Sequence, residues 1–246
     1  MADSILDIVT QACNEMGVEA PLQMVGSTDV GALQFLAVAN AAAEDILDQG
    51  FWTVLEKVYV FNSVAGQQEY PLPDDYGNLV IDTVWDRSQL TPMQGPLSPA
   101  LWQTIKSGLI GNGIYFTRYR VVRSVSKAAK VFVVDPPSPN TGSPLVFEYQ
   151  SNQFAVLADG SATNDKFLND TDTCIFPTKL LRRAIKWRWR REKQLEWATY
   201  LEEYNQLADT MIVRDRPQPG FSLAGPDYRQ NFLGWNNIPD TGFGNS

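Results

Sequence analysis

The chain has 246 residues, of which 44% are hydrophobic and 20% charged, and its net charge is −8. This length and composition suit a folded protein of one or two domains, and the excess of acid excludes general attraction to nucleic-acid phosphate. Histidine is absent, which excludes the commonest general base and metal ligand and leaves only carboxylate chemistry open.

Two helices are predicted at the beginning of the chain. Apolar residues recur at helical spacing over 4–16, and Gly17 follows as a stop signal. A second helix is predicted over 29–49, capped by Ser27 or Thr28, and its alanine-rich middle favours close packing against another helix. No run approaches the roughly 20 apolar residues of a membrane span, so no membrane contact is predicted.

The middle of the chain changes to the alternating pattern typical of strands. A short helix over 98–107 interrupts it, with Ser98 as cap and proline in its first turn. The segment 151–172 is polar and predicts a loop with at most short strands. The predicted strands and extended segments cover 52–61, 69–73, 79–85, 115–122, 130–134 and 145–149.

Helical spacing returns at the end of the chain. It holds over 177–213 without an internal glycine or proline, which predicts one long helix. The remaining 217–246 are rich in Pro, Gly and Asn and show no periodicity, so an extended tail is predicted.

This order of elements predicts an α+β fold. The N-terminal helices would form an antiparallel bundle with the long C-terminal helix, because both need a partner for an apolar face. An antiparallel β domain would be inserted between them, and an extended C-terminal tail would follow. The predicted limits are 1–50 with 175–213 for the helical domain, 51–174 for the β domain and 214–246 for the tail.

The predicted C-terminal helix carries a stripe of basic residues. At 100° per residue, six of its cations fall within an arc of about 100°. Contact with a neighbouring subunit or with a portal protein is the favoured interpretation, and contact with DNA phosphate or a solvated face are the alternatives. The six residues are Lys179, Arg182, Arg183, Lys186, Arg190 and Lys193.

Two pairs of carboxylates are candidates for chemistry. Asp74 with Asp75, and Asp170 with Asp172, have the residue type that glycosidases and hard cations use. Both pairs lie in predicted turns, where Asp caps and bridges the backbone, so a structural role is favoured. We therefore predict no catalytic residue, no metal site and no cofactor. The two cysteines, Cys13 and Cys174, do not make a metal-binding pair or a disulfide framework.

The predicted tail carries isolated aromatic residues separated by glycine and proline. Such a segment buries few aromatics by itself, so it is predicted to place them in pockets of a partner, with folding back on the same subunit as the alternative. The candidate residues are Phe221, Tyr228, Phe232, Trp235 and Phe243.

Several motifs, taken in order, resemble a family of phage proteins. The chain is similar over roughly residues 5–212 to the head-to-tail adaptors of short-tailed bacteriophages, also called tail tubular protein A or head completion proteins. The motifs that carry the resemblance lie at 8–17, 49–52, 68–76, 85–87, 170–172 and 186–188.

The resemblance implies a structural virion protein that is made in the host cytoplasm and assembles into the tail. Such adaptors form a homo-oligomeric ring of about twelve copies below the portal protein. The ring extends the channel for double-stranded DNA and gives a platform for the nozzle and tail fibre proteins, and C-terminal segments dock on the portal. A polysaccharide or peptidoglycan hydrolase of the tail and a DNA-binding module are the alternative functions.

Overall fold

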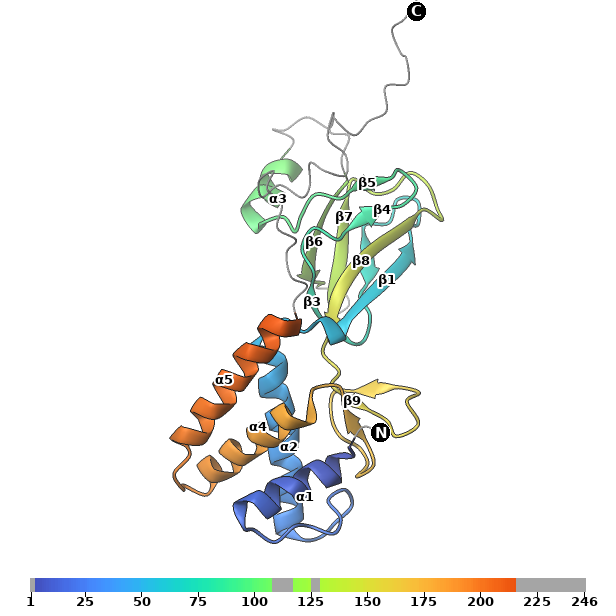
Figure 1. Cartoon of the computed structure of the whole chain (residues 1–246). Helices are drawn as coiled ribbons and strands as arrows, with labels where there is room; N and C mark the ends of the chain where they lie inside the picture. The colour runs from blue at the N-terminus through green and yellow to red at the C-terminus, as the bar shows by residue number, and fades with distance from the viewer. Residues whose placement is uncertain (1–2, 108–116, 125–128, 216–246) are drawn as a thin grey trace, which may run out of the picture. The chain divides into compact units, whose positions relative to one another are not determined.

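The computed structural model describes residues 3–107, 117–124 and 129–215. In this part the chain is a mixed α+β protein with five α-helices and three antiparallel sheets (Figure 1). This confirms the predicted α+β class. The helices are α1 (Ile5–Met16), α2 (Val30–Gln49), α3 (Pro99–Lys106), α4 (Thr178–Glu192) and α5 (Ala198–Asp215).

Local capping fixes the limits of α1. The Ser4 hydroxyl accepts a hydrogen bond from the Asp7 N–H at 3.2 Å, and the Asp7 carboxylate accepts one from the Ser4 N–H at 3.3 Å. This reciprocal pair satisfies two backbone donors that the first turn leaves open. Gly17 ends the helix with a φ of 68°, a conformation that glycine adopts without strain. The helix predicted over 4–16 is confirmed.

The second helix begins with a different cap from the one predicted. The Asp29 carboxylate accepts a hydrogen bond from the Ala32 N–H at 3.0 Å, so Asp29, and not Ser27 or Thr28, is the N-cap. The Ser27 hydroxyl instead accepts a hydrogen bond from the Asp29 N–H at 3.1 Å. The sequence could not distinguish the three, because all are of residue types that cap helices.

By length and composition alone, α2 is apolar enough to cross a membrane. It has 20 residues and a mean hydropathy of 1.3 over its most apolar window, and 39% of that window is buried. The prediction that no segment of the chain is long and apolar enough for a membrane span is therefore wrong. In the structure, α2 packs in a hydrophobic core with residues of α1, α4 and α5, as an apolar core helix also does.

The single long helix predicted over 177–213 is wrong, because the structure has two helices there. After α4 the chain turns at Gln194, whose φ is 55°. The Leu195 N–H donates to the Arg190 carbonyl at 2.9 Å, which closes the turn. The Glu196 carboxylate then accepts a hydrogen bond from the Thr199 N–H at 3.0 Å at the start of α5, and this bond lowers the pKa of Glu196.

The helical core is organised around α4, which packs against α1, α2 and α5 (Figure 1). Leu180, Leu181 and Ile185 of α4 are completely buried there. Aromatic side chains from the polar segment 151–172 also join this core: Phe154 and Phe167 are almost fully buried in it. The helices are therefore covered partly by a three-stranded sheet formed by β9 (Ala155–Val156), β10 (Thr163–Asn164) and β11 (Thr173–Cys174).

The remaining strands form two antiparallel sheets around a second, aromatic core. Phe132 stacks on Phe147 with ring centroids 5.2 Å apart, and on Tyr119 at the same distance. One sheet contains β1 (Glu56–Asn62), β3 (Tyr76–Leu79), β4 (Trp85–Asp86), β5 (Thr91–Pro92) and β8 (Pro144–Ser151). The other contains β2 (Glu69–Pro71), β6 (Arg118–Arg123) and β7 (Lys130–Asp135).

Most predicted strands are present, with one correction. The strand predicted over 79–85 is wrong, since β3 ends at Leu79 and β4 begins at Trp85. Asp82 lies between them with a φ of 67°, which breaks an extended segment. The helix predicted over 98–107 is confirmed as α3, with the Ser98 hydroxyl accepting from the Leu101 N–H at 3.3 Å.

Candidate functional site

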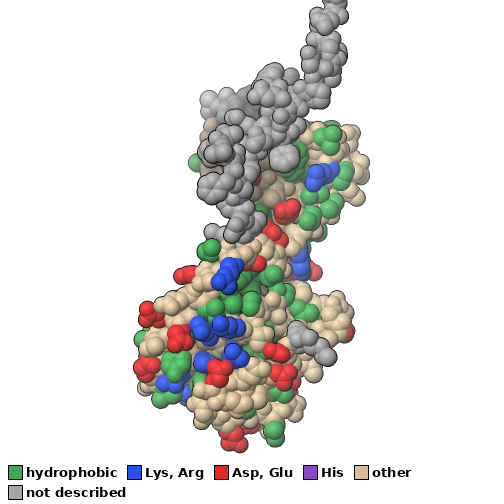
Figure 2. Space-filling model, viewed as in Figure 1, with side chains coloured by type: hydrophobic (Ala, Val, Ile, Leu, Met, Phe, Trp, Pro, Cys, Tyr) green, Lys and Arg blue, Asp and Glu red, His purple; other side chains and the backbone are tan. Residues whose placement is uncertain are grey.

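The six predicted cations lie on α4 and at its C-terminal cap, Lys193. We call Lys179, Arg182, Arg183, Lys186, Arg190 and Lys193 the basic stripe. Leu181 and Ala184 lie on the side of α4 opposite the stripe, in the helical core, while the buried Trp187 and Trp189 flank the stripe. Figure 2 shows Lys and Arg side chains gathered over the helices, with acidic side chains around them.

Glu15 of α1 binds two members of the basic stripe. The Arg182 Nε lies 3.0 Å from one Glu15 carboxylate oxygen, and the Lys186 Nζ lies 2.5 Å from the other. The hydrogen bond from Lys186 lowers the pKa of the Glu15 carboxyl. Arg182 also donates to the Gln11 side chain at 2.8 Å. These contacts attach α1 to α4.

Arg183 and Arg190 bind the returning helix and the turn before it. The Arg183 guanidinium donates to the Glu203 carbonyl at 3.0 Å, and Arg190 donates to the Glu196 carbonyl at 2.5 Å. The Arg190 guanidinium also lies 4.3 Å from the ring centroid of Tyr200. The stripe thus helps to hold the α4–α5 hairpin closed.

Lys193 and Lys179 differ in their surroundings. The Lys193 ammonium donates to the Gln34 side chain of α2 at 2.7 Å and lies 4.6 Å from the Trp189 ring. Lys179 is exposed and has no polar partner among the residues that the structure describes. Five members of the stripe therefore have contacts within the chain. Among the described residues, Glu15 is the one carboxylate that forms ion pairs with the stripe, so the stripe keeps an excess of positive charge.

The Asp170 and Asp172 carboxylates hold the backbone. Asp170 accepts hydrogen bonds from the Met24 N–H at 3.1 Å and the Val25 N–H at 2.9 Å. Asp172, which is 1% exposed, accepts from the N–H groups of residues 168 and 169, both at 2.8 Å. These contacts fix two loops of the helical core, which supports the structural interpretation of this pair.

Asp75 has an equally structural environment in the β region. Its carboxylate accepts hydrogen bonds from Lys57 at 2.6 Å, the Tyr149 hydroxyl at 2.7 Å and the Ser151 hydroxyl at 2.9 Å. Burial raises the pKa of Asp75, but the three donors together lower it by a larger amount, so the pKa lies below the ordinary value. Asp74 beside it is exposed. The contacts of Asp75 within the chain support the structural interpretation of this pair.

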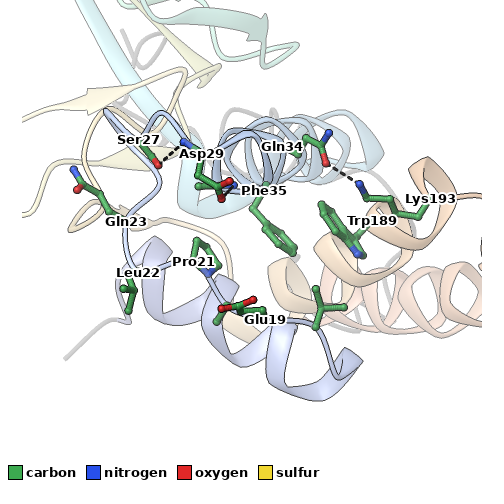
Figure 3. Close-up of a pocket in the computed structure, with 14 residues that line it drawn as sticks. Glu19, Pro21, Leu22, Gln23, Ser27, Asp29, Gln34, Phe35, Trp189 and Lys193 are labelled. Carbon is green, nitrogen blue, oxygen red and sulfur yellow. Dashed lines mark hydrogen bonds between the residues drawn. The ribbon is translucent and has the colours of Figure 1, made fainter.

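An open cleft of about 660 Å³ lies where α2, the end of α4 and the loop after α1 meet (Figure 3). Phe35 and Trp189 form its apolar wall, with ring centroids 3.9 Å apart and planes 11° apart. Two of its charged groups have structural partners, since Asp29 caps α2 and Lys193 donates to Gln34, and Glu19 also lines the cleft. The cleft offers shape and apolar surface but no nucleophile held beside a base.

Within the described ranges, no three His, Cys, Asp or Glu side chains are grouped so as to hold a metal ion. The Cys13 thiol is buried, and burial raises its pKa to about 11, which keeps it protonated at neutral pH. The five aromatic residues predicted to anchor the tail, from Phe221 to Phe243, lie outside the described residues.

The comparison with protein families identifies the class to which the chain belongs. A family model described as SU10 adaptor protein matches residues 3–224, which defines the class as phage head-to-tail adaptors. The chain belongs to the SU10 adaptor protein family. None of the curated proteins compared matches the chain.

Family membership makes the chain a structural component of the virion that associates with other head and tail components. The family is one of structural adaptors and not of enzymes. The resemblance found in the motifs is confirmed at this level, while the restriction to short-tailed phages stays a prediction. Sequence reasoning missed the intrachain partners of the basic stripe, because Glu15, Gln34 and Glu203 come from three other segments.

Proposed function

We propose that this chain is the subunit of an adaptor ring in a short-tailed phage. About twelve copies dock below the portal protein, extend the channel for double-stranded DNA and form the platform for the nozzle and tail fibre proteins. The observation that carries the proposal is the family match over residues 3–224. The copies are made in the host cytoplasm and end in the tail of the virion.

The charge of the chain supports the role of a DNA conduit. A net charge of −8 keeps the subunit from adhering to DNA over its whole surface, so DNA passes without being held. The basic stripe is then a contact for a neighbouring subunit or the portal, where its cations meet acidic groups. Duplex binding that weakens with salt and on Lys179→Ala would favour the DNA-binding alternative instead.

The tail after α5 supports a second contact. Residues 217–246 place aromatic side chains between glycines and prolines, a composition suited to an extended segment that fills pockets on a partner. We assign the portal as that partner. The same proposal includes the division into domains. The helical domain is 1–50 with 175–213, the β domain is 51–174 and the tail is 214–246.

The test uses the purified chain and the portal protein of the same phage, examined together by electron microscopy. A ring of this chain on the portal is expected, and its absence would sink the proposal. A variant ending at residue 216 isolates the tail. It should fold as the full chain does and bind the portal at least about tenfold more weakly. Equal binding by the shortened variant would contradict the proposal that the tail binds the portal.

A further inference from the structure

The outward side of α2 is apolar over more than half of its length. Six of its exposed and half-buried positions fall within an arc of about 80°. Val30 is 67% exposed and Leu33 is 46% exposed, and no charged residue occurs over 30–43. Glu44 and Asp48 continue the same side toward the C-terminal end of the helix and are exposed. We call Val30, Leu33, Ala37, Ala41, Glu44 and Asp48 the α2 face.

This amount of apolar surface exceeds what the helical core needs. The opposite side of α2 already supplies the buried residues of the helix, and only 39% of its most apolar window is buried in the chain. Contiguous apolar surface of this kind marks an interaction site in most proteins. The small side chains of Ala37 and Ala41 also allow a partner to approach the helix closely.

Two hollows lie beside the α2 face. The cleft of Figure 3 adjoins its beginning, and a second hollow of about 380 Å³ is lined by Ala37, Ala41 and Glu192. Both hollows also contain Trp189 and Lys193 in their walls. The α2 face is therefore flanked by concave surface that long side chains of a partner would fill.

The complementary surface is present on the same chain. Lys179, Arg183 and Lys186 of the basic stripe lie on the side of α4 turned away from α2, whereas Lys193 at the C-terminal cap donates to Gln34 of α2. Arg188 shows this, because it lies about 180° around α4 from Lys179 and binds Asp45 of α2. A subunit thus carries an apolar and acidic surface on α2 and a basic surface on another side of α4.

We propose that the α2 face of one copy binds the basic stripe of the next copy. Glu44 and Asp48 meet the cations, and the methylene stems of Lys and Arg lie over Ala37 and Ala41. Because the two surfaces differ and lie on different sides, the contact is heterologous, and its repetition gives a ring when the rotation from copy to copy closes. This inference rests on the proposed function, since it assigns the subunit contact within the adaptor ring.

The experiment blocks each surface separately. Ala41→Arg places a long cation on the α2 face, and Lys179→Glu with Arg183→Glu reverses the stripe. Matched controls make the same charge changes elsewhere on exposed positions: Gln206→Arg for the first, and Lys130→Glu with Lys166→Glu for the second. Urea unfolding verifies that every variant folds. Mass photometry counts the copies per assembly, with and without the portal protein.

Each surface variant alone should lose assembly at least about tenfold, because like charges face each other across the contact, and the controls should assemble as the unchanged chain does. Mixing the two surface variants is the sharper measurement. The intact stripe of the Ala41→Arg chain matches the intact α2 face of the other chain, so pairs form and rings do not.

Folded variants that assemble normally, or a mixture that forms no pairs, would contradict the contact between the α2 face and the basic stripe. The proposed adaptor ring would not be affected by either result. An unchanged chain that forms no ring even with the portal would count against the proposed function itself. Assembly lost in the Ala41→Arg chain but kept in the stripe variant would show that the α2 face binds the portal instead of a second copy.

Discussion

Arg188 of α4 and Asp45 of α2 form a two-bonded ion pair on the inner side of the helix that carries the basic stripe. The Arg188 Nη2 donates to Asp45 Oδ1 at 2.6 Å, and Arg188 Nε donates to Asp45 Oδ2. The hydrogen bond that Arg188 donates to Asp45 raises the pKa of Arg188. Arg188 therefore binds α2 on one side of α4, while Lys179, Arg183 and Lys186 of the basic stripe lie on the other side.

Removing one member of this pair should destabilise the helical core. Asp45→Asn leaves Arg188 half-buried without its carboxylate, which costs about 1–2 kcal/mol after allowance for partial exposure. A urea unfolding curve measures the loss as a lower midpoint. Asp48→Asn on the same helix is the control, because Asp48 is exposed and should leave the midpoint unchanged. Equal midpoints for both variants would contradict the role of the pair.

Asp172 should matter for folding and not for chemistry. Asp172→Ala removes the acceptor of two backbone N–H groups at a position that is 1% exposed, and the expected loss is about 2–3 kcal/mol. Thermal or urea unfolding provides the measurement, with Asp165→Ala, exposed in the same loop, as the control. A stable Asp172→Ala chain, or wall hydrolysis by the unchanged chain that vanishes in this variant, would revive the hydrolase alternative.

Asp75 should add stability that depends on pH. Because its pKa in the folded chain lies below the ordinary value of 3.8, its contribution is present above that pH and is lost as the pH falls toward the folded value. Asp75→Asn removes the titrating group. The difference in urea midpoint between the two chains should be constant near neutral pH and shrink below about pH 4. A difference that grew on acidification would contradict this assignment.

The turn between α4 and α5 should be improved by glycine. Gln194 has a φ of 55°, so Gln194→Gly relieves backbone strain and should raise stability by up to about 1 kcal/mol. Glu192→Gly, two residues earlier and inside α4, should instead lower stability by up to about 1 kcal/mol. Calorimetry distinguishes the two signs. A continuous helix through this region in solution would make both variants destabilising.

The helices that the sequence located well are those with local end signals. Ser4 with Asp7 and Ser98 with Pro99 are capping patterns that need no tertiary information. The division between α4 and α5 has no such signal, because no residue over 193–197 breaks a helix by itself. Trp187 of α4 lies against Tyr204 of α5 with ring centroids 6.0 Å apart, and such packing depends on the folded hairpin.

The same distinction applies to the contact surfaces. The arc of the basic stripe followed from helical spacing, and it holds in α4 because its five helical members precede the turn. Its partners could not be predicted, since Glu15 lies more than 150 residues away from Lys186. The α2 face did leave a trace in the sequence: a charge-free run over 30–43 is longer than one buried stripe requires.

The central claim is that this chain forms the ring between the portal and the tail. Cryo-electron microscopy of virions of the phage that encodes it tests this most directly, by tracing the helices and sheets described above in the density at the tail vertex. The account predicts a closed ring of copies directly below the portal, with the α2 face of each copy against the basic stripe of the next. Density for the chain elsewhere in the particle, or none at that vertex, would contradict it.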